Sequence, residues 1–219
     1  MMLKKILLTL ALCGVAFCAS AEPKNGVDYK TLPTAQNTET GKKIEVTEFF
    51  AYSCPHCNAF QPALSTWAKA QGANIVFKRI HVGNGPSMLP QQRLHFALEA
   101  LGLQDQLDGK VFHAMHVDRL RLNTDDLVFD FIAKQGVDRK QFVDAYNSFG
   151  VAARVRRANA MMEAYQVDSW PMIAIDGRFI TAPSLVNSSP KPASNEAELH
   201  ARVLAVMSYL VQTAQAGKK

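Results

Sequence analysis

The sequence from Ile44 to Cys57 reads IEVTEFFAYSCPHC, a run rich in β-branched and aromatic residues that leads straight into two cysteines. Such a run is typical of a buried strand, so we predict a strand over Ile44–Tyr52. Directly after the cysteines, Ala59–Ala70 has the composition of a helix, with apolar residues at helical spacing. The stretch therefore predicts a strand, a Cys-x-x-Cys turn and a helix in immediate succession.

Upstream and downstream of this unit, the strand and helix signals separate along the chain. The turn-rich residues 22–43 predict an entry segment with a short edge strand around Tyr29–Leu32, and Asn74–Val82 predicts a second strong strand. From residue 87 to 166, glycines and turn residues divide amphipathic segments, which predict four or five helices and no strand. We expect this stretch to form a helical subdomain.

Strand signals return near the end of the chain. Trp170–Ile175 and Arg178–Thr181 flank Asp176-Gly177, a strong hairpin signal. A polar surface loop is predicted over Ala182–Ser194, and a capping box at Asn195 opens a final helix that ends near Ala214. The order indicates an α/β protein in which residues 22–86 and 167–219 flank an inserted helical block, residues 87–166.

The composition bounds the class of protein. With 48% hydrophobic and 20% charged residues among 219, the chain can bury a full core, which excludes a disordered chain and a disulfide-dense miniprotein. Residues 1–21 combine two lysines, an apolar run too short to cross a bilayer, and the small-residue pattern Ala19-Ser20-Ala21. We predict a cleaved signal peptide and a mature chain without a membrane span. Phe17 before Cys18 argues against a lipoprotein.

The charge and the cysteine content of the mature chain narrow the class of protein further. The net charge falls from +5 to +3 with the loss of Lys4 and Lys5, which does not predict nucleic-acid binding. The densest basic cluster, Arg154–Arg157, is predicted to be an exposed helix face. Of the four cysteines only Cys54 and Cys57 remain, so the mature chain carries both of its cysteines in one Cys-x-x-Cys motif.

The residues around Cys54 favour a reactive thiolate. At the end of a strand, Cys54 would cap the following helix, where unpaired N–H groups and the helix dipole stabilise a negative sulfur. Pro55 fits the first turn because its missing N–H is not needed there. His56 adds a cation or an N–H donor beside the sulfur. Cys57, one turn further on, is predicted to be buried and to resolve the mixed disulfide formed at Cys54.

The sequence allows two other interpretations of the cysteines. A purely structural bridge would close a loop of only four residues, which gains little stability. A zinc site would need more ligands than the two cysteines supply, and nothing local connects His113 and His116 to them. We predict a surface or packing role for these histidines, no metal and no bound cofactor.

The chain resembles the DsbA family of periplasmic thiol-disulfide oxidoreductases, within the thioredoxin-like superfamily. The resemblance covers nearly all of the mature chain and rests on EFFAYSCPHC (Glu48–Cys57), RIHV (Arg79–Val82), the helical insert and WPMIAIDGRFI (Trp170–Ile180). CPHC is typical of this family, whereas thioredoxins typically carry CGPC. The resemblance implies a thioredoxin-like fold. The helix terminus and His56 already place the pKa of Cys54 toward the low end of about 3.5–7.5, a range whose lowest value belongs to the best-known member of this family.

Further residue roles are implied by the resemblance. Pro171 matches the cis-proline that faces the disulfide, where the flanking residues Trp170 and Met172 would hold a substrate peptide. Glu48 matches the acid beneath the site, and Arg79 stands where the family often has lysine; the alternative for Glu48 is an ordinary edge-strand acid. Trp170 departs from the family, whose best-known members have valine there, and would either enlarge the apolar groove with Met172 or block part of it.

Together these features predict a monomeric periplasmic oxidase that donates its Cys54–Cys57 disulfide to cysteines of newly secreted, unfolded proteins. The resemblance implies that a DsbB-like membrane quinone reductase reoxidises it. A reductase or isomerase of the DsbC/DsbG type is an alternative, although only some 22 residues precede the first strong strand and those proteins add a dimerisation domain. A non-enzymatic holdase that uses the same groove is the other alternative.

Overall fold

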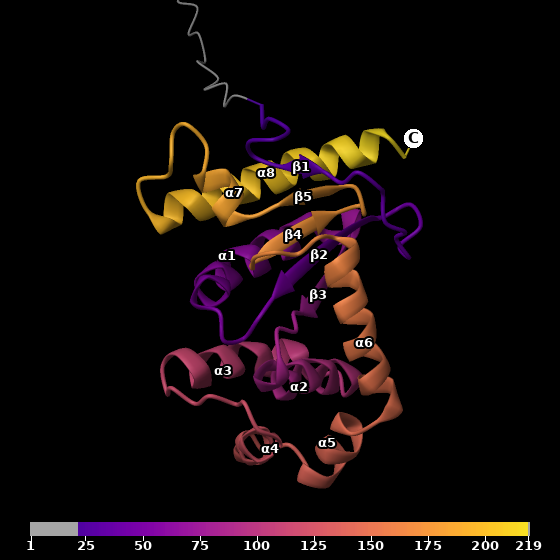
Figure 1. The fold of residues 1–219 in the computed structure, drawn as a ribbon, viewed down its shortest axis with the longest axis vertical. Helices are drawn as coiled ribbons and strands as arrows, with labels where there is room; N and C mark the ends of the chain where they lie inside the picture. Colours follow the sequence, from indigo (N-terminus) through magenta and orange to yellow (C-terminus); the bar gives the residue numbers. More distant parts are fainter. Residues whose placement is uncertain (1–21, 219) are drawn as a thin grey trace, which may run out of the picture.

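The computed structural model describes residues 22–218, so the predicted signal peptide lies outside the described residues. Five strands form one mixed sheet in the order β1-β5-β4-β2-β3 (Figure 1). They are β1 (Lys30–Thr31), β2 (Ile44–Phe50), β3 (Ile75–His81), β4 (Met172–Ile175) and β5 (Phe179–Thr181). Because β2 pairs parallel with β3 and antiparallel with β4, it lies inside the sheet, and all of its residues are buried.

Residues 22–218 contain eight α-helices besides the sheet. They are α1 (Pro55–Gln71), α2 (Leu89–Ala100), α3 (Gln104–His116), α4 (Asp125–Lys134), α5 (Arg139–Tyr146), α6 (Phe149–Ala164), α7 (Pro183–Asn187) and α8 (Glu196–Ala216). In Figure 1, α2 to α5 gather at one end of the molecule and α6 runs back from them to the sheet. The five helices between β3 and β4 agree with the helical content predicted there. The domain boundaries at residues 86 and 166 remain predictions.

Two hydrophobic clusters fill the interior on either side of the sheet. Ile44 and Val46 of β2 pack with residues of α1 and α8 in one cluster. Phe49 and Phe50, at the other end of the strand, belong to the larger cluster, which also contains buried residues from α2 to α6. The end of β2 that leads to Cys54 is therefore packed directly against the helical insert.

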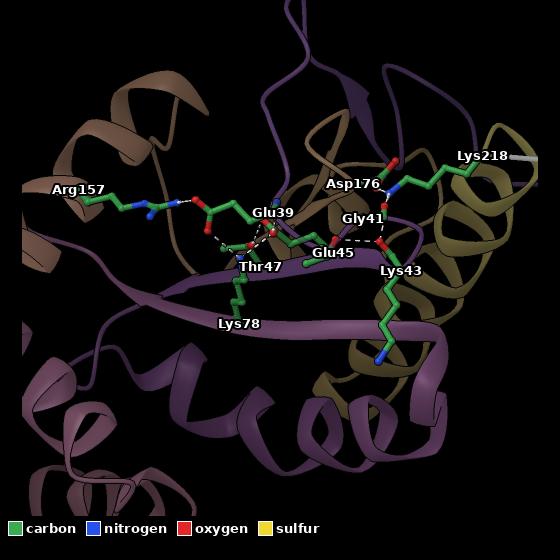
Figure 2. A network of polar contacts seen from close by, with 10 residues as sticks. Glu39, Gly41, Lys43, Glu45, Thr47, Lys78, Arg157, Asp176 and Lys218 are labelled. Atoms are coloured by element: carbon green, nitrogen blue, oxygen red, sulfur yellow. Dashed lines mark hydrogen bonds and ion pairs between the residues drawn. The ribbon is translucent and has the colours of Figure 1, made fainter.

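The entry segment is attached to three separate parts of the fold at the start of β2, the strand end away from Cys54 (Figure 2). Glu39 pairs with Arg157 of α6 at 2.7 Å and with Lys78 of β3 at 3.8 Å. Lys78 also pairs with Glu45 of β2 at 2.7 Å. Lys218, which follows α8, donates hydrogen bonds to the carbonyl oxygens of Gly41 and Lys43 at 3.2 and 3.1 Å. These contacts hold the chain in place where it enters the central strand.

The predicted basic helix face is exposed, as expected, but two of its arginines are paired. Arg157 contacts Glu39, and Arg154 contacts Glu99 of α2 at 2.6 Å. Both arginines therefore serve to attach α6 to its neighbours.

The predicted surface loop over Ala182–Ser194 is wrong in its first half, which forms α7. Pro183 occupies the first turn of this helix, and Pro183 and Val186 are buried. The Pro/Ser/Asn-rich composition concealed a single helical turn that is stabilised by packing on α8. The following helix has the predicted cap, since Asn195 accepts the N–H of Glu198 at 2.9 Å, whereas the Glu198 carboxylate accepts from Ser194.

Candidate active site

Cys54 caps the N-terminus of α1, where the chain has just left β2. Its backbone is extended, with φ −83° and ψ 118°, and Pro55 takes the first helical position. The Cys54 sulfur accepts a hydrogen bond from the backbone N–H of Cys57 at 3.3 Å. This sulfur therefore lies at the positive end of the helix dipole, beside N–H groups that have no partner within the helix. The geometry that the sequence predicted for Cys54 and Pro55 is confirmed.

These surroundings lower the pKa of the Cys54 thiol to about 6. The hydrogen bond with the Cys57 side chain has the largest effect; burial opposes it, and the N–H groups of Cys57 and His56 and the charge of His56 lower the pKa further. The direction agrees with the sequence argument. The value lies above the predicted low end because the sulfur is itself largely buried, with 8% of its residue surface exposed.

Cys57 lies one turn into α1 and is fully buried. Burial raises the pKa of its thiol far above the ordinary value, and the hydrogen bond and the charge of Cys54 act in the same direction, as does the charge of Glu48 whenever that residue is ionised. Both cysteines are free thiols, so the structure describes the reduced pair. The two sulfurs are thus differentiated, with a thiolate at the surface of the pair and a protonated thiol beneath it.

The loop before β4 faces the Cys54 sulfur. The Trp170–Pro171 peptide bond is cis, as the resemblance implied. The Cys54 sulfur lies 3.5 Å from the carbonyl oxygen of Trp170, to which it donates while it is protonated. Met172 follows as the first residue of β4 and is buried. The structure therefore brings the predicted cysteine pair and the predicted peptide-binding residues together across 116 residues of sequence.

Two pockets flank this site. One has a volume of about 470 Å³ and is lined by Met172 together with residues of β5 and α7, while Trp170 is not among its lining residues. The other has a volume of about 360 Å³ and extends from Ser53 across the start of α2 to the end of α3. The half-buried Trp170 side chain instead packs against the larger hydrophobic cluster.

Glu48 lies beneath the cysteines on the inside of the sheet, so its interpretation as an edge-strand acid is wrong. Its side chain is fully buried, and its Oε2 contacts Nε of Arg79 on the neighbouring strand at 2.7 Å. The two residues also face each other in the β2–β3 register. Burial raises the pKa of Glu48 despite the opposing effect of Arg79.

Sequence reasoning missed a set of buried polar residues around Tyr52, two positions before Cys54. The Tyr52 N–H donates to Nε2 of His81 at 3.1 Å, and its carbonyl oxygen accepts from Nε2 of His116 at 2.7 Å. Its hydroxyl donates to Asp108 of α3 and lies 3.3 Å from Nδ1 of His95. All three polar groups of Tyr52 are therefore fixed, and they fix the approach of the chain to Cys54.

His113 and His116, the two histidines considered as metal ligands, have different surroundings. His113 is exposed, whereas His116 donates a hydrogen bond to the Tyr52 carbonyl oxygen. Within residues 22–218, no three His, Cys, Asp or Glu side chains are arranged to hold a metal ion. In the same range, no helix has both the length and the apolar character that a bilayer crossing requires.

Comparison with known proteins places the chain among its relatives. Residues 63–191 match the model of the DSBA-like thioredoxin domain, and this match begins beyond Cys57 and so does not depend on the CPHC motif. The chain is 38% identical to the thiol:disulfide interchange protein DsbA of Burkholderia cepacia, over 87% of its own length and 93% of the relative's. The chain belongs to the DsbA family. The DsbA of Bordetella parapertussis is 37% identical over 84% and 88% of the two chains.

Solved structures of DsbA proteins share the fold. The crystal structure of Pseudomonas aeruginosa DsbA has a TM-score of 0.78 and 28% identity, covering 88% of this chain and 94% of that chain. The DsbA of Xylella fastidiosa has a TM-score of 0.78 and 26% identity, covering 90% and 100%. The predicted thioredoxin-like α/β fold with a helical insertion is confirmed. So is the predicted activity: the protein is a thiol–disulfide oxidase that acts on cysteines of other proteins.

Proposed function

We propose that Cys54 is the attacking and leaving sulfur of this DsbA-family oxidase and that Cys57 is its resolving partner. The observation that carries the proposal is the position of the Cys54 sulfur, at the N-terminus of α1 and 3.5 Å from the Trp170 carbonyl oxygen. A thiolate stabilised there is a good leaving group, because the rate of exchange rises as the pKa of the departing thiol falls. The reduced pair is favoured, which makes the disulfide oxidising.

The reaction begins when a substrate thiolate attacks the Cys54 sulfur of the oxidised protein. The Cys54–Cys57 bond breaks, its electron pair goes to Cys57, and a mixed disulfide joins Cys54 to the substrate. A second substrate thiolate then attacks the substrate sulfur of this mixed disulfide, and Cys54 leaves as a thiolate. Two electrons pass from the substrate to the protein, which ends as the dithiol that the structure describes.

The substrate is held by the residues around the cis-proline. Pro171 and the Trp170 carbonyl present a backbone edge next to Cys54, where an extended peptide adds like a strand. The 470 Å³ pocket beside Met172 would receive a side chain of that peptide. This arrangement suits newly secreted proteins that still expose cysteines and apolar residues.

The predicted signal peptide and the family support a proposal for the cellular setting. The protein acts in the periplasm after cleavage behind Ala21, as a monomer, and a DsbB-like quinone reductase of the inner membrane reoxidises it. Cell fractionation with N-terminal sequencing, sedimentation, and reoxidation by membranes with and without that reductase test these three parts separately.

The decisive experiment is equilibration of the Cys54–Cys57 pair with glutathione, read by alkylation and mass. A potential of about −120 mV, the value known for the best-known DsbA, supports the oxidase direction. A potential of about −270 mV, as in thioredoxin, would reverse the direction of electron flow and favour the reductase alternative. Cys54→Ala should abolish the oxidation of substrate cysteines. If this variant bound peptides and still performed the protein's function, the holdase alternative would be favoured.

A further inference from the structure

A cluster of one cation and two carboxyl groups lies beneath Cys57, and its members come from three elements. Nε of Arg79, on β3, contacts Oε2 of Glu48, on β2, at 2.7 Å. Nη1 of the same guanidinium contacts Oδ2 of Asp108, on α3, at 2.9 Å. The helical insert therefore reaches the redox site through Asp108, and the two carboxyl groups share a single guanidinium.

The carboxyl groups of Asp108 and Glu48 differ in how many hydrogen bonds they accept. Asp108 accepts from Arg79 with one oxygen and from the Tyr52 hydroxyl with the other. Glu48 uses only Oε2, and its buried Oε1 has no hydrogen-bond partner among the described residues. Hydrogen bonds to both oxygens favour the ionised form of a carboxyl group. Burial raises the pKa of both carboxyl groups, but Asp108 has hydrogen bonds to both of its oxygens and is thus the better site for the negative charge.

The other titratable groups around the cluster add no positive charge. Burial lowers the pKa of both His81 and His95 to about 3, so these rings are neutral near pH 7. Burial raises the pKa of Tyr52 and of Cys57, which keeps both of them protonated. Within residues 22–218, Arg79 is the one charged donor in contact with Glu48 and Asp108. If both carboxyl groups were ionised, a buried excess negative charge would remain, which is costly.

We propose that Asp108 is a positioning residue for the proton exchange between Glu48 and Cys57 that the family resemblance implies: it engages the Arg79 guanidinium so that Glu48 retains its proton. The inference rests on the proposed roles of Cys54 and Cys57. When the disulfide is reduced, the Cys57 sulfur receives the electron pair and takes the Glu48 proton, and the new Glu48 carboxylate is stabilised by Arg79 until solvent reprotonates it. Before the disulfide re-forms, Glu48 releases its proton to solvent, and the resulting carboxylate then takes the proton of Cys57.

Asp108→Asn tests this inference, because it removes the competing charge and keeps a group that accepts from Tyr52. The full Arg79 charge then acts on Glu48, which loses its proton at a lower pH, by at least about one pH unit. Two readouts apply to the mature protein: the infrared carbonyl band of protonated Glu48, and the pH midpoint of Cys57 attack on a Cys54–glutathione mixed disulfide. Both midpoints should move to lower pH.

Three further variants make the test specific. Asp130→Asn, which removes the exposed partner of Arg139, should leave both midpoints unchanged. Tyr52→Phe should move them in the same direction as Asp108→Asn but less, and it serves if Asp108→Asn fails to fold. In a Glu48→Gln background, Asp108→Asn should produce no further shift. An unchanged midpoint in folded Asp108→Asn protein, or an equal shift in the Glu48→Gln background, would overturn the inference.

These outcomes are separable from the proposed function. If Cys54→Ala retained oxidase activity, the roles of the two cysteines would fail, whatever Asp108→Asn did. If Cys54→Ala were inactive and the Asp108→Asn midpoints were unchanged, the cysteine roles would hold and the inference about Asp108 would be wrong.

Discussion

The backbone N–H of Cys57 donates to the sulfur of Cys54 across 3.3 Å. One cysteine of the pair thus stabilises the anion of the other, through its amide as well as through its thiol. The stabilisation is available only when Cys57 occupies the first turn of α1. The first turn of α1, with Cys54 at its cap and Cys57 inside it, therefore makes the two sulfurs chemically different.

Iodoacetamide alkylation of Cys54 should titrate with a midpoint near pH 6, since the pKa of this thiol is lowered to about 6. His56→Ala should raise the midpoint by removing a positive charge, yet leave it below the ordinary value of about 8.5, because the Cys57 thiol and both N–H groups remain. Mass spectrometry of the quenched reaction gives the midpoint. A wild-type value near 8.5 would contradict the role assigned to the helix terminus.

The stability of the reduced protein should depend on pH through Cys54. The pKa of this thiol is lower in the folded protein, about 6, than in the unfolded chain, about 8.5. The resulting stabilisation is fully present above pH 8.5 and is lost as the pH falls through 6. Urea unfolding of reduced wild type and of Cys54→Ala should therefore give a free-energy difference that grows between pH 6 and 8.5. A constant difference across this window would rule out the thiolate.

His81 should make the protein sensitive to acid. Its Nε2 accepts from the Tyr52 N–H and its Nδ1 donates to the Val82 carbonyl, which fixes a neutral ring, and burial lowers its pKa to about 3. The unfolded chain binds a proton at this position below about pH 6.5, so stability falls between pH 6.5 and 3 by up to about 1.4 kcal/mol per pH unit. His81→Gln should lose this part of the slope in urea titrations; an identical slope in both proteins would refute it.

Gly177 should be irreplaceable in the β4–β5 hairpin. Its φ is +65°, and a Cβ there would lie 2.0 Å from the carbonyl oxygen of Gln36. Gly177→Ala should destabilise the protein by more than about 1 kcal/mol. Gly109→Ala is the matched control, because this helical glycine in α3 has nothing within 4 Å of an added Cβ and should gain about 0.5–1 kcal/mol. Equal Tm changes for both variants would contradict the prediction.

Local signals account for the part of the site that was predictable from sequence. The β2 strand, the Cys54 cap and the start of α1 depend on neighbouring residues, and the Asp176-Gly177 turn is equally local. The cis-proline position came from the family resemblance, since sequence physics alone marks Pro171 only as a proline at the start of a strand. These elements place Cys54, Cys57 and Pro171 without any knowledge of the tertiary structure.

The polar contacts beneath the site were not predictable in this way. Asp108 lies on the buried face of α3 beside Leu107 and Val111, and an acidic residue on such a face was a usable signal. Its partner Arg79, however, is 29 residues away and on a strand, so only the packing of the insert on the sheet brings them together. Tyr52 was hidden for a related reason, because an aromatic residue in a buried run indicates core packing and does not reveal where its hydroxyl will point.

The three partners that hold Tyr52 lie 29, 56 and 64 residues along the chain, in His81, Asp108 and His116. Contacts of such large sequence separation require long loops to close, which costs entropy and slows folding. A ribosome-bound chain that has released only the first strand and helix therefore lacks all three partners of Tyr52. The path by which the chain approaches Cys54 is fixed only after β3 and α3 have been synthesised and have packed on the first strand.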